Sequence, residues 1–438
     1  MKGWTIPVGQ KPWASLKRLR IKNFKTFRSL DLSLDRLNVL IGANASGKSN
    51  LVQVFKFLSD ISEQGLENAI SLQGGVEFLR NLNIGAREPT EISLAMEPPT
   101  YRLRDPGRKL ALSVREFKYD FQIRYKGRQR SGLGFAVGKQ TIEADLEISR
   151  AASPTDTVKP YQGVVSVSLD DGKYDFDLRL PSELESVRDK LLDLLFWSPS
   201  TAAKLPVREG RLLIDYRSDV PLSFLLAFEP PLKGIGVYDF EPKLLKSATP
   251  IAGKADLEPD ANNLPIVLNE ILRDREGRRR MQNLLRDLLP FISDLKVSLF
   301  ADRTLLVMMK EVYSGLPIPA SFLADGTLSI LALLTAVYFS RKWLVVIEEP
   351  DRHIHPSLIR GVVEILKEAC EETQIIITTH NPEVVKTAGL DHILLVSRDE
   401  EGYSTITRPR DKREVKIFLK NKIGLDELYV DGLLEAWV

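Results

Sequence analysis

A run of glycine and small residues at positions 42–49 has the spacing of a phosphate-binding loop. It reads Gly42-Ala43-Asn44-Ala45-Ser46-Gly47-Lys48-Ser49, and Asn50 follows it. Glycines at both ends let backbone N–H groups surround a phosphate, and a following helix presents its positive N-terminal end. The pattern predicts that Lys48 reaches the β- and γ-phosphates and that the Ser49 hydroxyl binds Mg²⁺. A Gly/Ser turn with a surface lysine is the plainer alternative.

A second candidate group is a pair of carboxylates at the end of an apolar run, Val345-Val346-Ile347-Glu348-Glu349-Pro350. A strand buried on both faces delivers its last residues to the sheet edge where α/β proteins bind ligands. Alternation sends the two side chains in different directions. We therefore predict that Glu348 supports Mg²⁺ and that Glu349 polarises an attacking water. A strand that simply ends in solvated acids is the alternative.

Histidines are few, and three of the four follow apolar runs in the C-terminal half. His380 ends the run QIIITTH, where its side chain could contact a γ-phosphate or hold the attacking water. A hydrogen-bonded structural role is the alternative. His353 and His355 could form a zinc site, but the single intervening residue and the following Pro356 indicate a turn instead of a helical ligand pair.

The elements that would position the phosphate loop are a buried strand at 37–41 and a helix at about 48–61. Alternating patterns predict strands at 16–27 and 29–34 before it. Further alternating strands are predicted at 91–95, 117–125, 141–148, 164–169 and 174–180. Helical periodicity predicts helices at 183–197 and 266–289, which proline-rich loops join.

The C-terminal third returns to strands and helices in alternation. Strands are predicted at 294–300, 303–312, 343–347, 374–377 and 393–397, and helices at 327–339 and 357–371. Such alternation implies a parallel sheet with covered faces. We expect the two ends of the chain to form halves of one α/β domain, 1–181 and 291–438, with a mostly helical insertion at 182–290.

Composition limits the function classes. The 438 residues carry 61 Lys and Arg against 59 Asp and Glu, so a nucleic-acid surface would have to be local. One cysteine excludes a disulfide framework and any Cys-built metal site, and it suits a reducing compartment. No long apolar run and no signal-peptide pattern is present, so we expect a cytoplasmic protein without membrane contact.

These motifs together resemble a known family. The order of phosphate loop, long insertion, FLADGT at 322–327, VVIEEP, HIHP and TTH is similar to ATP-binding-cassette ATPases of the SMC/RecF/OLD branch, in particular the stand-alone AAA_21 ATPases. The motifs lie in about the first 60 residues and the last 150. The resemblance implies an α/β fold of the P-loop NTPase, ABC-ATPase head type, with an antiparallel β subdomain and a mostly helical insertion.

The resemblance also implies roles for individual residues. The run Leu323-Ala324-Asp325-Gly326-Thr327 falls at the cassette signature, which completes the ATP site of a second subunit in a sandwich dimer. Glu348 falls at the magnesium acid, Glu349 at the catalytic glutamate and His380 at the switch histidine, with Lys48 in the phosphate loop. Gln73 is the candidate for the Q-loop glutamine at the metal.

Ala324 departs from the family pattern, because a serine usually stands there. Loss of one hydrogen bond to a charged phosphate costs about 1.5–3 kcal/mol. We therefore expect weak nucleotide-driven dimerisation and slow turnover.

OLD nucleases also carry a Toprim domain, whereas too few residues follow His380 for one here. We expect no nuclease within this chain.

The function implied is a Mg-dependent ATPase that acts as a nucleotide-switched homodimer or higher oligomer. Its target would be DNA or a separate effector nuclease, in anti-phage defence or DNA repair. Basic residues and tyrosines at 102–130, and the basic run at 273–280, are candidate DNA contacts, with a solvated face as the alternative. A regulatory scaffold with little hydrolysis and an ABC transporter subunit are the other functions, although the long separation of Lys48 and Leu323 argues against the transporter.

Overall fold

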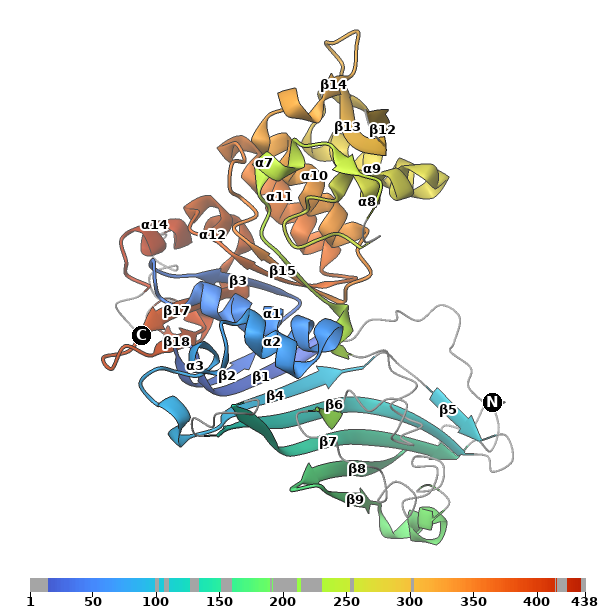
Figure 1. Cartoon of the computed structure of the whole chain (residues 1–438), viewed down its shortest axis with the longest axis vertical. Coiled ribbons are helices and arrows are strands. Elements are labelled where there is room, and N and C mark those ends of the chain that lie inside the picture. Colours follow the sequence, from blue (N-terminus) through green and yellow to red (C-terminus); the bar gives the residue numbers. More distant parts are fainter. Residues whose placement is uncertain are drawn as a thin grey trace. The chain divides into compact units, whose positions relative to one another are not determined.

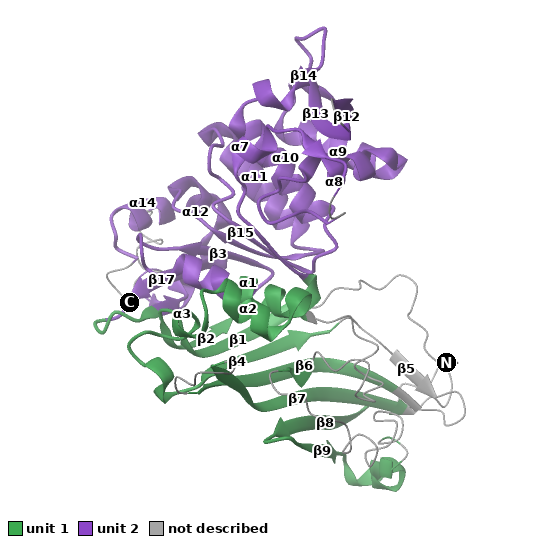
Figure 2. Cartoon of the chain, viewed as in Figure 1, with its two compact units in different colours: residues 1–34, 56–234, 400–404 green, residues 35–55, 235–399, 405–438 purple. Residues whose placement is uncertain are grey.

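The computed structural model describes residues 15–98, 102–105, 110–126, 134–150, 160–189, 191, 211–213, 231–252, 256–300, 303–413, 415 and 424–434. The chain divides into two compact units, shown in Figure 2. Unit 1 contains residues 1–34, 56–234 and 400–404, and unit 2 contains residues 35–55, 235–399 and 405–438. The phosphate loop and the C-terminal motifs therefore belong to the same unit.

Unit 1 is built on an antiparallel sheet in the order β2-β1-β4-β6-β7-β8-β9, with β5 paired to β6 (Figure 1). The strands are β1 (Ser15–Phe24), β2 (Phe27–Ser33), β4 (Thr90–Glu97), β5 (Arg102–Asp105), β6 (Leu110–Tyr125), β7 (Phe135–Arg150), β8 (Tyr161–Asp170) and β9 (Lys173–Arg179). Buried and more exposed side chains alternate along β4 and β8, as a sheet with one covered face requires. The alternating strands predicted from the sequence are confirmed, except that the strand expected at 16–27 ends at Phe24 and Phe27 already belongs to β2.

Unit 2 is built on a sheet in the order β10-β15-β16-β3-β17-β18. Its strands are β10 (Ile235–Tyr238), β15 (Leu344–Glu348), β16 (Gln374–Thr378), β3 (Leu37–Ile41), β17 (Ile393–Arg398) and β18 (Ser404–Thr407). The first five pair in parallel. All five residues of β3 and of β16 are buried, which explains their mostly apolar character. The predicted α/β fold with a parallel sheet is confirmed.

Helices bury one face of this sheet. They are α8 (Leu264–Arg273), α9 (Arg275–Leu288), α10 (Asp325–Tyr338), α11 (Pro356–Ala369) and α12 (Pro382–Ala388). Alternate residues of the strands, such as Val39, Val345 and Ile375, share one hydrophobic core with them. Each such side chain contributes about 1.5–3 kcal/mol by leaving water. This core fixes the strand ends that carry the polar motifs.

The remaining elements are short apart from the helix after the phosphate loop. They are α1 (Lys48–Gln64), α2 (Leu66–Leu72), α3 (Val76–Leu79), α7 (Pro242–Leu245) and α14 (Leu425–Val430), with a small antiparallel sheet of β11 (Thr249–Pro250), β12 (Ile292–Phe300), β13 (Thr304–Glu311) and β14 (Ile318–Pro319). No helix among the described residues is both long and apolar enough to cross a membrane.

Two predicted helices differ from the structure. The helix expected at 266–289 is broken at Asp274, whose extended backbone ends α8 and whose side chain accepts a hydrogen bond from Gly277 N and so caps α9. The helix expected at 183–197 begins with a 3₁₀ turn at Ser182–Val187, and most of its remainder lies outside the described residues. The expected helical segment also supplies β10, a sheet strand that the sequence pattern did not predict.

Candidate functional site

The phosphate loop joins β3 to α1 and has the backbone conformation that its glycines predict. Gly42 has φ +146°, and a Cβ there would lie 2.1 Å from the carbonyl oxygen of Val396 on β17. Gly47 also has a positive φ, of 119°. Only glycine fits the first position, because any side chain would collide with a neighbouring strand.

Lys48 lies inside the loop and is only 7% exposed. Its Nζ donates hydrogen bonds to the carbonyl oxygens of Gly42 at 2.9 Å and Ala43 at 2.8 Å. The ammonium is thus held at the centre of the loop by weak neutral acceptors. A phosphate oxygen is a stronger, charged acceptor, so the lysine is poised to exchange these partners for a nucleotide.

Ser49 and Glu348 meet although they lie about 300 residues apart in the sequence. The Ser49 hydroxyl donates to Glu348 Oε2 at 3.0 Å. Ser49 is exposed and the glutamate half-buried, so both oxygens remain accessible. Mg²⁺ prefers oxygen ligands and binds through one or two protein groups plus phosphates and waters. This pair fits such a metal, with Ser49 and Glu348 as the residues that would hold it.

Glu349 and His380 lie beside this pair, after the ends of the neighbouring parallel strands β15 and β16. His380 Nε2 is 3.6 Å from Glu349 Oε1, and Arg352 Nε is 3.8 Å from the other carboxylate oxygen. Glu349 has φ +42°, in the left-handed region that is rare for side-chain-bearing residues. Its N–H donates to the carbonyl and hydroxyl oxygens of Thr378, each at 3.1 Å, which holds it in place.

The signature residues begin α10, as predicted. Ala324 stands at the N-cap and offers no side-chain hydrogen bond to the helix. A Cβ on Gly326 would lie 2.6 Å from the carbonyl oxygen of His353, so this glycine lets the helix approach the turn after β15. Leu323 and Thr327 are buried beside it.

Asp325, in the first turn of α10, makes an ion pair with Lys246 at 2.5 Å. The hydrogen bond from Lys246 lowers the pKa of the Asp325 carboxyl below its usual value. A carboxylate in the first helical turn is also favoured by the helix dipole. Asp325 therefore already has a positive partner within the chain.

The other predicted site residues have separate environments. Gln73 belongs to unit 1, where it is buried, so its assignment as a metal ligand rests on the resemblance alone. His355 caps α11, with its Nδ1 accepting from Ser357 N, which accounts for it as a structural residue. No group of three metal-binding side chains occurs among the described residues, so the zinc alternative has no support there.

One protein-family profile matches residues 37–386 of the 438, a span that contains the phosphate loop, the signature, the paired glutamates and His380. Its description is "AAA domain, putative AbiEii toxin, Type IV TA system". The chain belongs to this family, AAA_21. The resemblance drawn from the motifs is thereby confirmed.

Two curated relatives of this AAA_21 chain share one name with each other. Septu protein PtuA of Bacillus mycoides is 33% identical over 132 residues, which are 26% of this chain and 19% of that protein. Septu protein PtuA of Bacillus thuringiensis is 26% identical over 102 residues, 21% of this chain and 26% of that one. The matches thus span about a quarter or less of each relative.

Solved structures similar to this AAA_21 chain include two SMC heads. One is the Smc head domain of Pyrococcus furiosus, which has an extended coiled coil and is bound to the C-terminal domain of ScpA. It gives a TM-score of 0.44 at 12% sequence identity, and the match covers 94% of this chain and all of that one. The SMC head domain of Thermotoga maritima gives a TM-score of 0.38 at 15% sequence identity. The match covers 90% of this chain and 98% of that one. Because both scores are below 0.5, the fold assignment rests on the sheet order and the family match.

Arg398 is a candidate site residue that sequence reasoning missed. It ends β17, next to the phosphate-loop strand, and its Nε donates to the carbonyl oxygen of Ala45 at 3.0 Å. Ala45 has φ +61° at the exposed crest of the loop. Arg398 thus supports the loop and adds a positive charge beside it. A basic residue at the end of a strand was the only sequence signal for it.

We predict that Arg398→Ala weakens ATP binding about fivefold, because a charge-assisted hydrogen bond and a nearby cation are both lost. Titration calorimetry with ATP measures the change. Arg360→Ala, which removes an exposed arginine of α11, is the matched control and should bind ATP normally. An unchanged affinity in Arg398→Ala would remove this residue from the site.

The candidate DNA surface at 102–130 lacks the expected aromatic platform among its described residues. Tyr119 is fully buried, where it stacks on Phe121 and donates to Gln140. Tyr125 bonds to Thr90 and lies under the Arg80 guanidinium. Lys118 is ion-paired, because it lies within 4 Å of Glu116, Glu143 and Asp145. Tyr101 and residues 106–109 and 127–133 lie outside the described residues.

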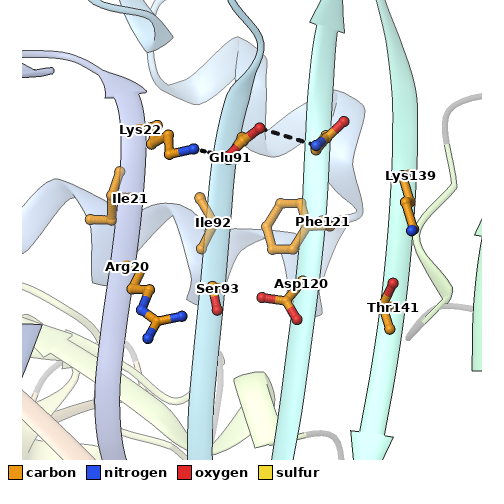
Figure 3. Close-up of a pocket in the computed structure, with 11 residues that line it drawn as sticks. Arg20, Ile21, Lys22, Glu91, Ile92, Ser93, Asp120, Phe121, Lys139 and Thr141 are labelled. Atoms are coloured by element: carbon orange, nitrogen blue, oxygen red, sulfur yellow. Dashed lines mark hydrogen bonds and ion pairs between the residues drawn. The ribbon is translucent and has the colours of Figure 1, made fainter. Parts of the chain in front are cut away.

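A shallow pocket of about 400 Å³ on the same sheet also lacks the charge of a phosphate site (Figure 3). Its walls carry Arg20, Lys22 and Lys139 but also Glu91 and Asp120. Lys22 and Gln122 both bind Glu91. A dashed line in Figure 3 marks the contact of Lys22 with Glu91. The opposing carboxylates would repel a nucleic-acid backbone at this pocket.

Proposed function

We propose that this chain binds ATP with Mg²⁺ and hydrolyses it to ADP and phosphate at the phosphate loop of unit 2. The observation that carries the proposal is the 3.0 Å contact of Ser49 with Glu348, with Glu349 and His380 immediately beside it. A metal-binding pair, a buried loop lysine and a second carboxylate are the parts that phosphoryl transfer to water needs.

Each residue has a distinct part in this reaction. Lys48 releases the carbonyl oxygens of the loop and binds the β- and γ-phosphates, while Arg398 keeps the loop crest in place. Glu349 accepts the proton of the attacking water as the water oxygen forms its bond to the γ-phosphorus and the bond to the ADP oxygen breaks. His380 orients that water or the γ-phosphate. Mg²⁺, when bound, neutralises charge on the β- and γ-oxygens.

The first test is phosphate release by the purified chain with ATP, with and without Mg²⁺. We expect slow turnover that EDTA abolishes. ATP that binds and is never cleaved, even in a single turnover, would instead favour the regulatory scaffold, which the alanine at position 324 supports as a second candidate. Absence of both binding and cleavage would refute both.

We further propose that ATP joins two copies, with the signature of each facing the nucleotide of the other. Family membership supports this arrangement, and the exposed N-cap residue Ala324 before α10 is compatible with it. The partner that responds to the ATP-bound state is an effector protein such as a separate nuclease. The described basic strands support this choice over DNA, because they present little surface suited to binding DNA. The type IV toxin wording of the family description favours defence over repair.

The signature alanine gives a gain-of-function prediction. Ala324→Ser should restore a hydroxyl donor at the N-cap, worth about 1.5–3 kcal/mol against a charged phosphate. In the presence of ATP we expect dimerisation at least tenfold tighter, measured by sedimentation velocity. Ser321→Ala, at the exposed position three residues earlier, should leave dimerisation unchanged. Equal dimerisation of Ala324→Ser and wild type would exclude the signature from the interface.

A further inference from the structure

Asp351 is a partly enclosed carboxylate to which the mechanism above gives no role. It lies two residues after Glu349, in the turn between β15 and α11. Its Oδ1 is inaccessible to solvent and has no hydrogen-bond partner among the described residues. Burial raises the pKa of this carboxyl above its usual value. A carboxylate buried in this way needs a hydrogen bond or a charge partner that compensates for its lost contact with water.

That interaction comes from the loop after β16. Hydrogen bonding from the side chains of Thr379 and Asn381, which flank His380, opposes the effect of burial and lowers the pKa of the Asp351 carboxyl. Because Oδ1 has no partner, Oδ2 is the oxygen that accepts them. Asp351 therefore joins the loop that carries Glu349 to the loop that carries His380.

The donors and acceptors of this network are fixed by its other bonds. Asn381 N donates to Thr379 Oγ1 at 2.9 Å, so the threonine hydrogen is free to point at Asp351. Asn381 Oδ1 accepts from Glu383 N at 2.9 Å at the start of α12, which leaves its amide nitrogen to donate to Asp351. Thr379 is fully buried, so its hydroxyl has no solvent alternative.

Hydrogen bonds also connect the end of β15 to the end of β16 at a second place, where Glu349 N donates to the carbonyl and hydroxyl oxygens of Thr378. The bonds to Thr378 hold the backbone of Glu349. The hydrogen bonds of Asp351 hold Thr379 and Asn381, the residues on both sides of His380. Both sets of contacts connect the residues around Glu349 to the residues around His380. Asp351 also begins the turn that ends at Ile354, whose N–H donates to the Asp351 carbonyl oxygen at 3.2 Å.

We infer that Asp351 is a positioning residue that sets the spacing of Glu349 and His380 through Thr379 and Asn381. It does not contact the nucleotide. The inference rests on the proposed hydrolysis and predicts a selective defect, in which kcat falls while ATP binding is kept. Misplacement of a reacting group by about 1 Å lowers rates by about a hundredfold.

The test measures kcat, KM and ATP affinity for two substitutions at position 351, with thermal melting as a check of folding. We expect Asp351→Ala to lower kcat about tenfold to a hundredfold at unchanged ATP affinity. Asp351→Asn keeps one acceptor oxygen at the Oδ2 position, so it should stay within about threefold of wild type. Asp391→Ala, at an exposed aspartate of unit 2, is the control and should match wild type.

A double-mutant cycle separates positioning from a general loss of structure. If Asp351 acts through His380, Asp351→Ala should lower kcat no further in the His380→Ala background. If Asp351→Ala does not fold, Thr379→Val replaces it in the cycle, because it removes only the donor hydroxyl.

Wild-type turnover by Asp351→Ala, additive losses in the cycle, or an equal loss of ATP binding would each overturn the inference while leaving the proposed function intact. A wild-type chain that never cleaves ATP would instead refute the proposed hydrolysis, and this inference with it.

Discussion

Glu349→Gln should bind ATP with near-normal affinity and release phosphate at least a hundredfold more slowly than wild type. The amide keeps the size and the backbone hydrogen bonds of the glutamate to Thr378, but it cannot accept the proton of the attacking water. A positioned general base contributes about 10²–10⁴-fold to a rate. Phosphate release and retention of labelled ATP after gel filtration measure the two parts of the prediction.

The same variant should also accumulate any ATP-bound dimer, because the step that dissolves it is blocked. Glu368→Gln, which makes the same exchange at an exposed position of α11, is the matched control and should turn over normally. Turnover by Glu349→Gln at the wild-type rate would show that another group activates the water, and Glu348 would be the first to examine.

Lys48→Ala should lose ATP binding by a hundredfold or more. The ammonium is the buried cation of the phosphate loop, and it would replace two neutral acceptors with charged phosphate oxygens on binding. Charge-assisted hydrogen bonds are worth about 1.5–3 kcal/mol each, so two of them account for a loss of this size. Titration calorimetry with a non-hydrolysable ATP analogue measures it without turnover.

Lys56→Ala provides the control for the lysine substitution, since it removes an exposed lysine from the same helix. We expect it to bind the analogue as wild type does. Thermal melting without nucleotide should show only a small loss for Lys48→Ala, because the freed carbonyl oxygens of Gly42 and Ala43 can bond to water. Normal affinity in a folded Lys48→Ala chain would contradict the phosphate-loop assignment.

The sequence by itself determined the local parts of this protein. The apolar run at 37–41, the glycine spacing of the loop and the helical periodicity after it are short-range patterns, and β3, the positive φ values of Gly42 and Gly47, and α1 follow from them. Alternation over four to eight residues likewise indicated the strands of unit 1. These features depend on backbone sterics and on hydrogen bonds between near neighbours, which a stretch of sequence carries within itself.

The tertiary structure decided which distant residues meet. Parallel pairing of β15, β16 and β3 brings Glu348 to Ser49 and places His380 beside Glu349, and the register of β17 brings Arg398 to the loop crest. It also buried Tyr119, which the sequence pattern left open as a DNA contact. The physical reason is that strand order, register and the packing of one face depend on the whole core at once, whereas no short segment encodes its neighbours in space.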